Sequence, residues 1–73
     1  MPNAKSIRDM REMVGIKQIE LARKAGIDRS RLSTAENGHI QLRLDEMAAI
    51  RKALASIAQQ KAKQLEKLSE MVL

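Results

Sequence analysis

The chain is built almost entirely from residues that favour the α-helix, and this limits its fold more than any other feature of the sequence. Alanine, leucine, methionine, lysine, arginine, glutamine and glutamate predominate among its 73 residues. Residues typical of strands are scarce, with one threonine and no tyrosine, phenylalanine or tryptophan. We therefore predict an all-α fold, and a chain of this length has room for a single small domain.

Three glycines divide the chain into helical segments, because glycine commonly ends a helix. They are Gly15, Gly26 and Gly38. The spacing of apolar residues predicts helices over residues 5–13, 18–24, 29–37 and 44–54. In the first of these, Ile7, Met10 and Val14 form one apolar stripe. Asp28 precedes the third, where its carboxylate is expected to cap the free N–H groups of the first turn.

Residues 55–73 contain neither glycine nor proline. Either Ser56 and Gln59 form a capping box that begins a fifth helix, or the fourth helix continues as one rod. An apolar stripe along this segment has nearly coiled-coil spacing, and its larger members are Leu65, Leu68 and Val72. The stripe is either a dimer seam or a surface folded onto the chain's own core. Of these two alternatives, we favour the seam.

The sequence thus predicts a compact bundle of about five helices. Residues 1–54 would carry the main function, and residues 55–73 would form a C-terminal helix for dimerisation or packing within the same single domain. The basic balance, with 14 lysines and arginines against 9 acidic residues and a net charge of +5, favours a polyanionic partner. Nucleic acid and an acidic membrane surface both fit this charge.

Several classes of function are disfavoured by the composition. There is no cysteine, and a single histidine, His39, cannot build a metal site alone. The sequence has no Ser/His/Asp set and no glycine-rich phosphate loop, so we expect no catalysis, cofactor, metal or small-molecule ligand. Its apolar runs are far shorter than the ~20 residues of a membrane span. Its start lacks the apolar stretch of a signal peptide, so we expect a cytoplasmic bacterial or phage protein without a membrane partner.

The most informative segment is the tight join between the second and third predicted helices, at residues 25–28. A short glycine-containing turn between two short helices is typical of a helix-turn-helix unit. The third helix would then face outward with small polar side chains beside Arg29. Small polar groups let a helix sit deep in a major groove, and an arginine can bind guanine through two hydrogen bonds.

The stretches IRDMREMVGIKQIELARKAGIDRSRLSTAENG and LDEMAAIRKAL resemble the phage repressor and Cro type of helix-turn-helix domain, the XRE-like or lambda-repressor-like family. The resemblance covers residues 6–54. It implies a five-helix domain that binds operator DNA as a dimer. Arg51 stands where this family usually has alanine, so it either extends into solvent or contacts a partner.

The resemblance also implies roles for individual residues. The base-reading positions are Arg29, Ser30, Ser33 and Thr34. Gln18 matches a residue that contacts a phosphate beside a helix N-terminus, and Asn37 matches a segment that contacts the DNA backbone. Arg11 and Glu36 match an ion pair that joins the first and third helices.

Three further cations lie in loops or at helix edges. Phosphate contact is expected for Lys17 and Arg43. For Arg31, phosphate contact and an unpaired surface charge remain open.

Taken together, the charge, the helix-turn-helix unit and the family resemblance lead us to expect a DNA-binding transcriptional repressor that acts as a homodimer on a pseudo-palindromic duplex site. The alternative is a DNA-binding antitoxin or protein-interaction module whose C-terminal helix covers a partner protein.

Overall fold

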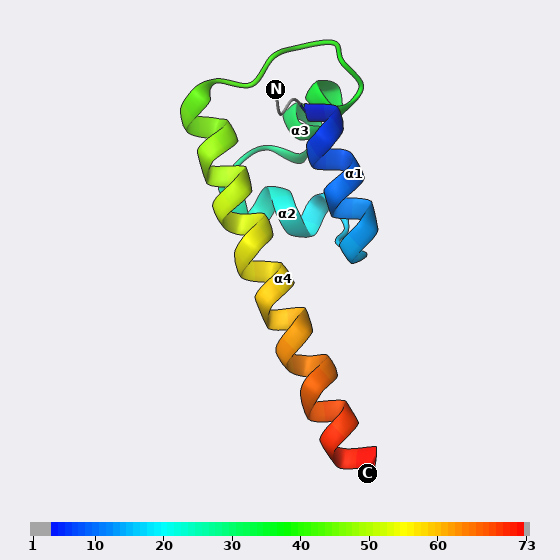
Figure 1. Cartoon of the computed structure of the whole chain (residues 1–73). Coiled ribbons are helices and arrows are strands. Elements are labelled where there is room, and N and C mark those ends of the chain that lie inside the picture. The colour runs from blue at the N-terminus through cyan, green and yellow to red at the C-terminus, as the bar shows by residue number, and fades with distance from the viewer. Residues whose placement is uncertain (1–3, 73) are drawn as a thin grey trace.

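The computed structural model describes residues 4–72, and within this range α-helices are the only regular secondary structure, as predicted. Four helices follow one another along the chain (Figure 1). They are α1 (Ala4–Val14), α2 (Gln18–Ala25), α3 (Arg29–Glu36) and α4 (Leu44–Val72). The first three agree with their predicted ranges to within one residue at either end.

The ends of α2 and α3 are fixed by the residues that the sequence analysis identified. Gly26 ends α2 in the left-handed conformation, with φ of 74°, and its backbone N–H donates to the carbonyls of the last turn. A non-glycine residue there would be strained even though the space beside it is open. Asp28 begins α3, and its Oδ1 accepts a hydrogen bond from the Ser30 backbone N–H at 2.8 Å. These two caps define the short connection between the helices.

The prediction of a fifth helix is wrong, and the alternative of one continuous rod is correct. α4 runs for 29 residues, and Ser56 lies in its middle. A helix of this length spans about 43 Å, and no glycine or proline interrupts it. The expected boundary between residues 54 and 55 falls inside α4, and Ile57 beyond that boundary is still buried in the core.

The core lies where α1, α2 and α3 meet the N-terminal half of α4. Its buried members are Ile7, Ile16, Leu21, Ala22, Leu32, Ile50, Ala53, Leu54 and Ile57. Of the stripe predicted on α1, only Ile7 is buried. Met10 is 38% exposed and Val14 is 37% exposed, because one side of the α1–α4 contact is left open to solvent. The sequence analysis did not single out Ile16 and Ile57.

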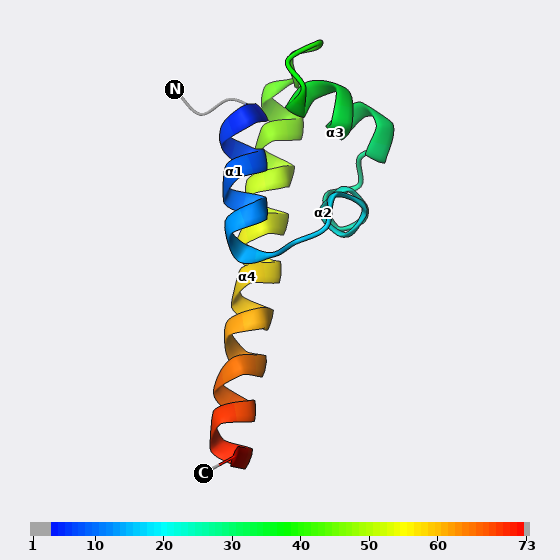
Figure 2. The same cartoon turned by 90° about the vertical axis from the view of Figure 1, so that its right-hand side faces the viewer.

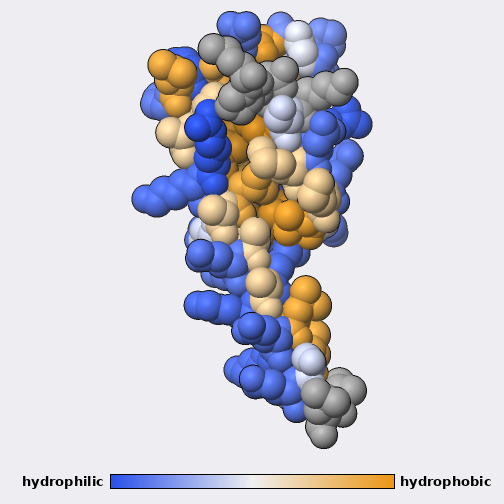
Figure 3. Space-filling view, in the orientation of Figure 1, coloured by the Kyte–Doolittle hydropathy of each residue, from blue (hydrophilic) through white to orange (hydrophobic). Residues whose placement is uncertain are grey.

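The C-terminal half of α4 projects away from the other three helices (Figures 1 and 2). Leu65 is 66% exposed and Leu68 is 56% exposed. The alternative in which this stripe folds onto the chain's own core is therefore wrong for these two residues. The side chain of Val72, the third residue of the predicted seam, lies outside the described part. Figure 3 shows hydrophobic side chains between α1 and α4 and farther down the rod.

Candidate nucleic-acid interface

α2 and α3 form a compact unit that the core holds from one side. Leu21 and Ala22 on α2 are buried, as are Leu32 and Ala35 on α3. In the connection, the Ile27 backbone N–H donates to the Ala22 carbonyl at 2.9 Å, which closes the turn. Small residues on the inner faces allow the two short helices to approach closely. The result is two helices joined by a tight turn, with the outer face of the second left free.

The outer face of α3 carries every residue assigned to base reading. At 100° per residue, these four residues and Asn37 occupy one arc of α3, about 140° wide. Arg29 and Ser30 are exposed, while Ser33 and Thr34 are half-buried. Arg29 makes no hydrogen bond or ion pair with any residue in the described range, so its guanidinium is available.

The hydroxyl of Thr34 is already engaged on this face. Its Oγ1 donates to the Ser30 carbonyl at 2.8 Å, one turn earlier in α3. This hydrogen bond fixes the rotamer and leaves the oxygen lone pairs and the methyl group of Thr34 for other contacts. The arc therefore combines one free cation with short side chains.

A buried ion pair positions this face relative to the rest of the molecule. The Arg11 guanidinium donates to both carboxylate oxygens of Glu36, from Nε at 3.1 Å and from Nη2 at 2.9 Å. The side chains are 12% and 2% exposed. Arg11 Nη1 also donates to the Ile16 carbonyl at 2.9 Å, and Gln18 Nε2 donates to Glu36 Oε1 at 3.1 Å. The expected pairing of Arg11 with Glu36 is confirmed, and it joins α1, the following loop, α2 and α3 at one point.

A second ion pair, which the sequence analysis missed, joins α3 to the start of α4. Arg31 donates to Glu46 from Nε at 2.6 Å and from Nη2 at 2.9 Å, and the backbone N–H of Arg43 donates to the same carboxylate at 2.8 Å. The hydrogen bonds from Arg31, followed by that from Arg43, lower the pKa of Glu46 to about 2. The contact also raises the pKa of Arg31.

This pair corrects the interpretation of Arg31 as an unpaired surface charge. In the free protein two of its donor groups are bound to Glu46, so Arg31 holds α3 against α4. The sequence held a signal for the cap that Glu46 forms with Arg43, but none for its pairing with Arg31. Glu46 stands three residues after Arg43, the residue before α4, and this is the spacing of a glutamate that caps its own helix. The cross-helix partner is not encoded in that spacing.

The start of α2 offers unsatisfied donors. Lys17 precedes this helix and its side chain makes no capping hydrogen bond, so the first N–H groups remain open. Lys17 is exposed, and Gln18 lies next to it with one amide hydrogen directed to Glu36.

The exposed side chain of Arg43, just before α4, lies near two carboxylates. Its Nε is 3.4 Å from Asp45 Oδ1 and 3.6 Å from Glu46 Oε1. Its charge is therefore shared with two carboxylates.

A comparison with protein families identifies this arrangement. The model of a helix-turn-helix family matches residues 7–58, which is most of the chain. The chain belongs to the Cro/XRE-like helix-turn-helix family. Members of this kind are DNA-binding transcription regulators, and α2 and α3 are the helices that give this regulator its family name. Comparison with curated proteins and with solved structures gave no match.

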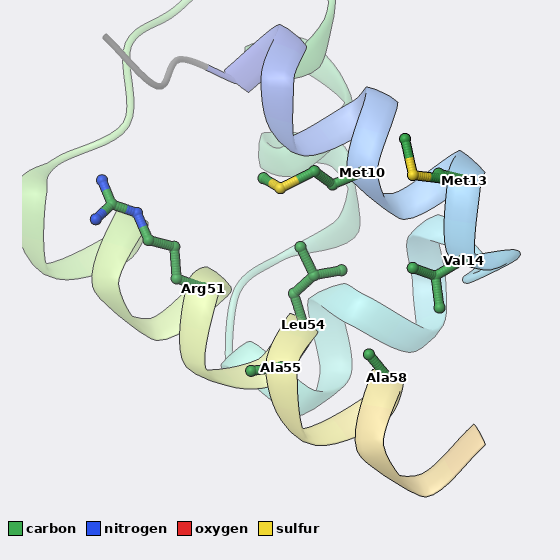
Figure 4. Close-up of a pocket in the computed structure, with 7 residues that line it drawn as sticks. All are labelled: Met10, Met13, Val14, Arg51, Leu54, Ala55 and Ala58. Carbon is green, nitrogen blue, oxygen red and sulfur yellow. The ribbon is translucent and has the colours of Figure 1, made fainter. Parts of the chain in front are cut away.

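Within residues 4–72, no group of three or more histidine, cysteine, aspartate or glutamate side chains is arranged to hold a metal ion. None of the described helices is long and apolar enough to cross a membrane. The surface of the described residues includes two open depressions. One lies between α1 and α4 (Figure 4) and the other between α2 and α4.

Proposed function

We propose that this helix-turn-helix protein is a sequence-specific repressor that binds a pseudo-palindromic operator as a homodimer. The observation that carries the proposal is the outer arc of α3, where an unpaired arginine stands among short polar side chains. Such a surface fits the depth of the major groove and the donor and acceptor pattern of base edges. Bound there, the protein would block other proteins from the same stretch of duplex, which is why we propose repression.

In this proposal one set of residues contacts base edges and a second set contacts phosphates. Arg29, Ser30, Ser33 and Thr34 read base edges and give sequence preference. The start of α2, with Lys17 and Gln18, contacts phosphates, and Asn37 at the end of α3 does the same. Arg43 and the free donors of Arg31 make further phosphate contacts. These contacts supply affinity and salt dependence. The network around Glu36 connects the two sets, because Gln18 and α3 both depend on it.

A homodimer explains how a short recognition helix gains enough affinity. Two copies would place two α3 helices on one face of the duplex, with half-sites one helical turn, about 34 Å, or a multiple of it apart. Operator occupancy would then respond to the protein's concentration through dimerisation.

The test is the Arg29→Ala variant measured on an operator and on single-base variants of it. Loss of a bidentate base contact should weaken operator binding by about 1–3 kcal/mol and relax the preference at one base position. Arg8→Ala is the matched control, because Arg8 is an exposed arginine on α1 whose only ion pair among the described residues is the surface pair with Glu12. Equal weakening on every sequence, or the same effect from Arg8→Ala, would refute the role of Arg29.

A second candidate function is supported by the exposed C-terminal half of α4. Leu65, Leu68 and Met71 are solvent-exposed large apolar side chains on this rod, and such residues gather at interaction surfaces. In a DNA-binding antitoxin they would cover a partner protein. Purification from the native host separates the two functions, since a second protein at constant stoichiometry favours the antitoxin and a single species favours the repressor.

A further inference from the structure

Glu46 holds the Arg31 side chain in one orientation beside the outer face of α3. Its carboxylate accepts hydrogen bonds from Arg31 Nε at 2.6 Å and Nη2 at 2.9 Å, and from the Arg43 backbone N–H at 2.8 Å. The Glu46 side chain is 8% exposed, whereas that of Arg31 is 40% exposed. The pair therefore has a buried acidic side and a basic side that reaches solvent.

The hydrogen bonds to Glu46 use only one edge of the planar Arg31 guanidinium. A guanidinium carries five N–H donors, and binding through Nε and Nη2 leaves three of them on the edge formed by Nη1 and Nη2. Among the described residues, none accepts a hydrogen bond from this second edge. The edge fits two oxygens of a phosphate, which arginine binds through paired hydrogen bonds. Arg31 can thus hold a carboxylate and a phosphate at the same time.

Arg31 lies at one border of the base-reading arc of α3, where a DNA strand would pass. At 100° per residue, Arg31 lies about 60° beyond Thr34 around the helix. At the opposite border Glu36 lies about 20° beyond Arg29, and Gln18 donates a hydrogen bond to it. A helix in the major groove has a sugar-phosphate strand on each side. Arg31 would therefore face one strand and Gln18 the other.

We propose that Glu46 is a positioning residue for DNA binding, which orients Arg31 toward a phosphate and stays bound to Arg31 in the complex. The inference rests on the proposed function and adds a residue that itself makes no contact with DNA. A carboxylate near DNA ordinarily weakens binding, because it repels the phosphates. Here Arg31 balances the charge of Glu46. The Arg31 side chain is also ordered before DNA arrives, so that holding a phosphate costs little further side-chain entropy.

The neighbouring carboxylate, Asp45, provides a control of equal charge. Its side chain is exposed and contacts Arg43 Nε at 3.4 Å, and it makes no ion pair with Arg31. Glu46 remains charged at neutral pH, because hydrogen bonds from Arg31 and then Arg43 lower its pKa to about 2. Both residues thus carry a negative charge under the conditions of a binding assay, but only Glu46 orients Arg31.

Anisotropy of a labelled duplex, titrated with wild type, Glu46→Gln and Asp45→Asn at several salt concentrations, tests the inference. A random-sequence duplex serves as well as an operator, because phosphate contacts do not depend on sequence. Glu46→Gln should bind about three- to ten-fold more weakly, as expected when one side chain must be ordered on binding. The salt slope should fall by up to about one. Asp45→Asn should bind as well as wild type or more tightly, and the same result for Glu46→Gln would overturn the inference.

Glu46 also caps α4 through the Arg43 backbone N–H, so a second comparison separates orientation from folding. Arg31→Ala should weaken duplex binding, and adding Glu46→Gln to it should cause no further loss. An undiminished further loss would assign Glu46 to the fold alone and overturn the inference. Arg31→Lys needs no change at Glu46 and keeps the charge, but a lysine has no second edge. It should bind several-fold more weakly, and wild-type binding by this variant would overturn the inference.

Nuclear magnetic resonance of the Arg31 Nε–H tests whether Glu46 stays bound in the complex. This proton should be protected from exchange both in the free protein and on DNA, and Glu46→Gln should remove the protection. Loss of protection when wild type binds DNA would show that phosphate replaces Glu46, and would overturn the inference. Duplex binding without sequence preference contradicts the proposed regulator, but the Glu46→Gln loss would still support this inference. A wild type that binds no duplex would overturn both.

Discussion

Replacing Glu36 by glutamine tests whether one buried carboxylate holds the α2–α3 unit on its scaffold. Glu36→Gln keeps the size of the side chain but removes the charge that Arg11 meets at 2.9 Å. The Arg11 guanidinium, 12% exposed, would lose its counter-ion in a largely buried position. Removing one partner of a buried pair costs about 3–5 kcal/mol. We expect the lower end, about 3 kcal/mol, because Arg11 keeps its hydrogen bond to the Ile16 carbonyl.

This loss is large for so small a chain. At about 0.05–0.15 kcal/mol per residue, 73 residues have a free energy of unfolding of about 4–11 kcal/mol. The assay is urea unfolding followed by circular dichroism at the helix band, since the chain has no aromatic residue to report by fluorescence. The midpoint should fall while the slope with urea stays constant.

Glu12→Gln provides the matched control. It removes the exposed pair with Arg8, whose side chains are about half exposed, and such pairs contribute at most about 1 kcal/mol. If Glu36→Gln and Glu12→Gln destabilise equally, the reasoning about the buried network is refuted. A double variant, Arg11→Met with Glu36→Met, should be less destabilised than the sum of its single variants, because neither charge is left buried alone.

Three further predictions concern the caps and the second ion pair. Asp28→Ala should lower the free energy of unfolding by about 1 kcal/mol in urea unfolding, through loss of the cap on Ser30. Gly26→Ala should cost about 1–2 kcal/mol by the same assay, because alanine resists the left-handed conformation even where space is open. Glu46, with its pKa lowered to about 2 in the folded state, stabilises the fold above the ordinary glutamate pKa. The contribution of Glu46 to the free energy of unfolding should fade as the pH drops from about 4.5 toward about 2. When the stability of Glu46→Gln is measured against pH, this part of the acid destabilisation should be absent.

How far the sequence could predict this molecule depended on whether the relevant signal was local. Gly26 and Asp28 act within one turn of themselves, so the α2–α3 connection was predictable to within one residue. The pairing of Arg11 with Glu36 spans 25 positions and came from the family resemblance, not from spacing.

Features that depend on the assembled tertiary structure were not predictable in the same way. Periodicity placed Met10 on one stripe with Ile7, but it cannot tell how much of the stripe a neighbouring helix covers. The partner of Arg31 is 15 positions away on another helix, and only the fold brings the two together. The continuity of α4 was left open because Ser56 and Gln59 suit both a helix start and a helix interior.

Selection of bound sites from a pool of random duplex DNA tests the central claim, that the outer arc of α3 reads sequence in a duplex. The wild type should enrich sites with two related half-sites in inverted orientation. Arg29→Ala should enrich the same symmetry with one position in each half-site relaxed. A wild-type pool that stays random at moderate salt, or an identical selected sequence from wild type and Arg29→Ala, would contradict the account.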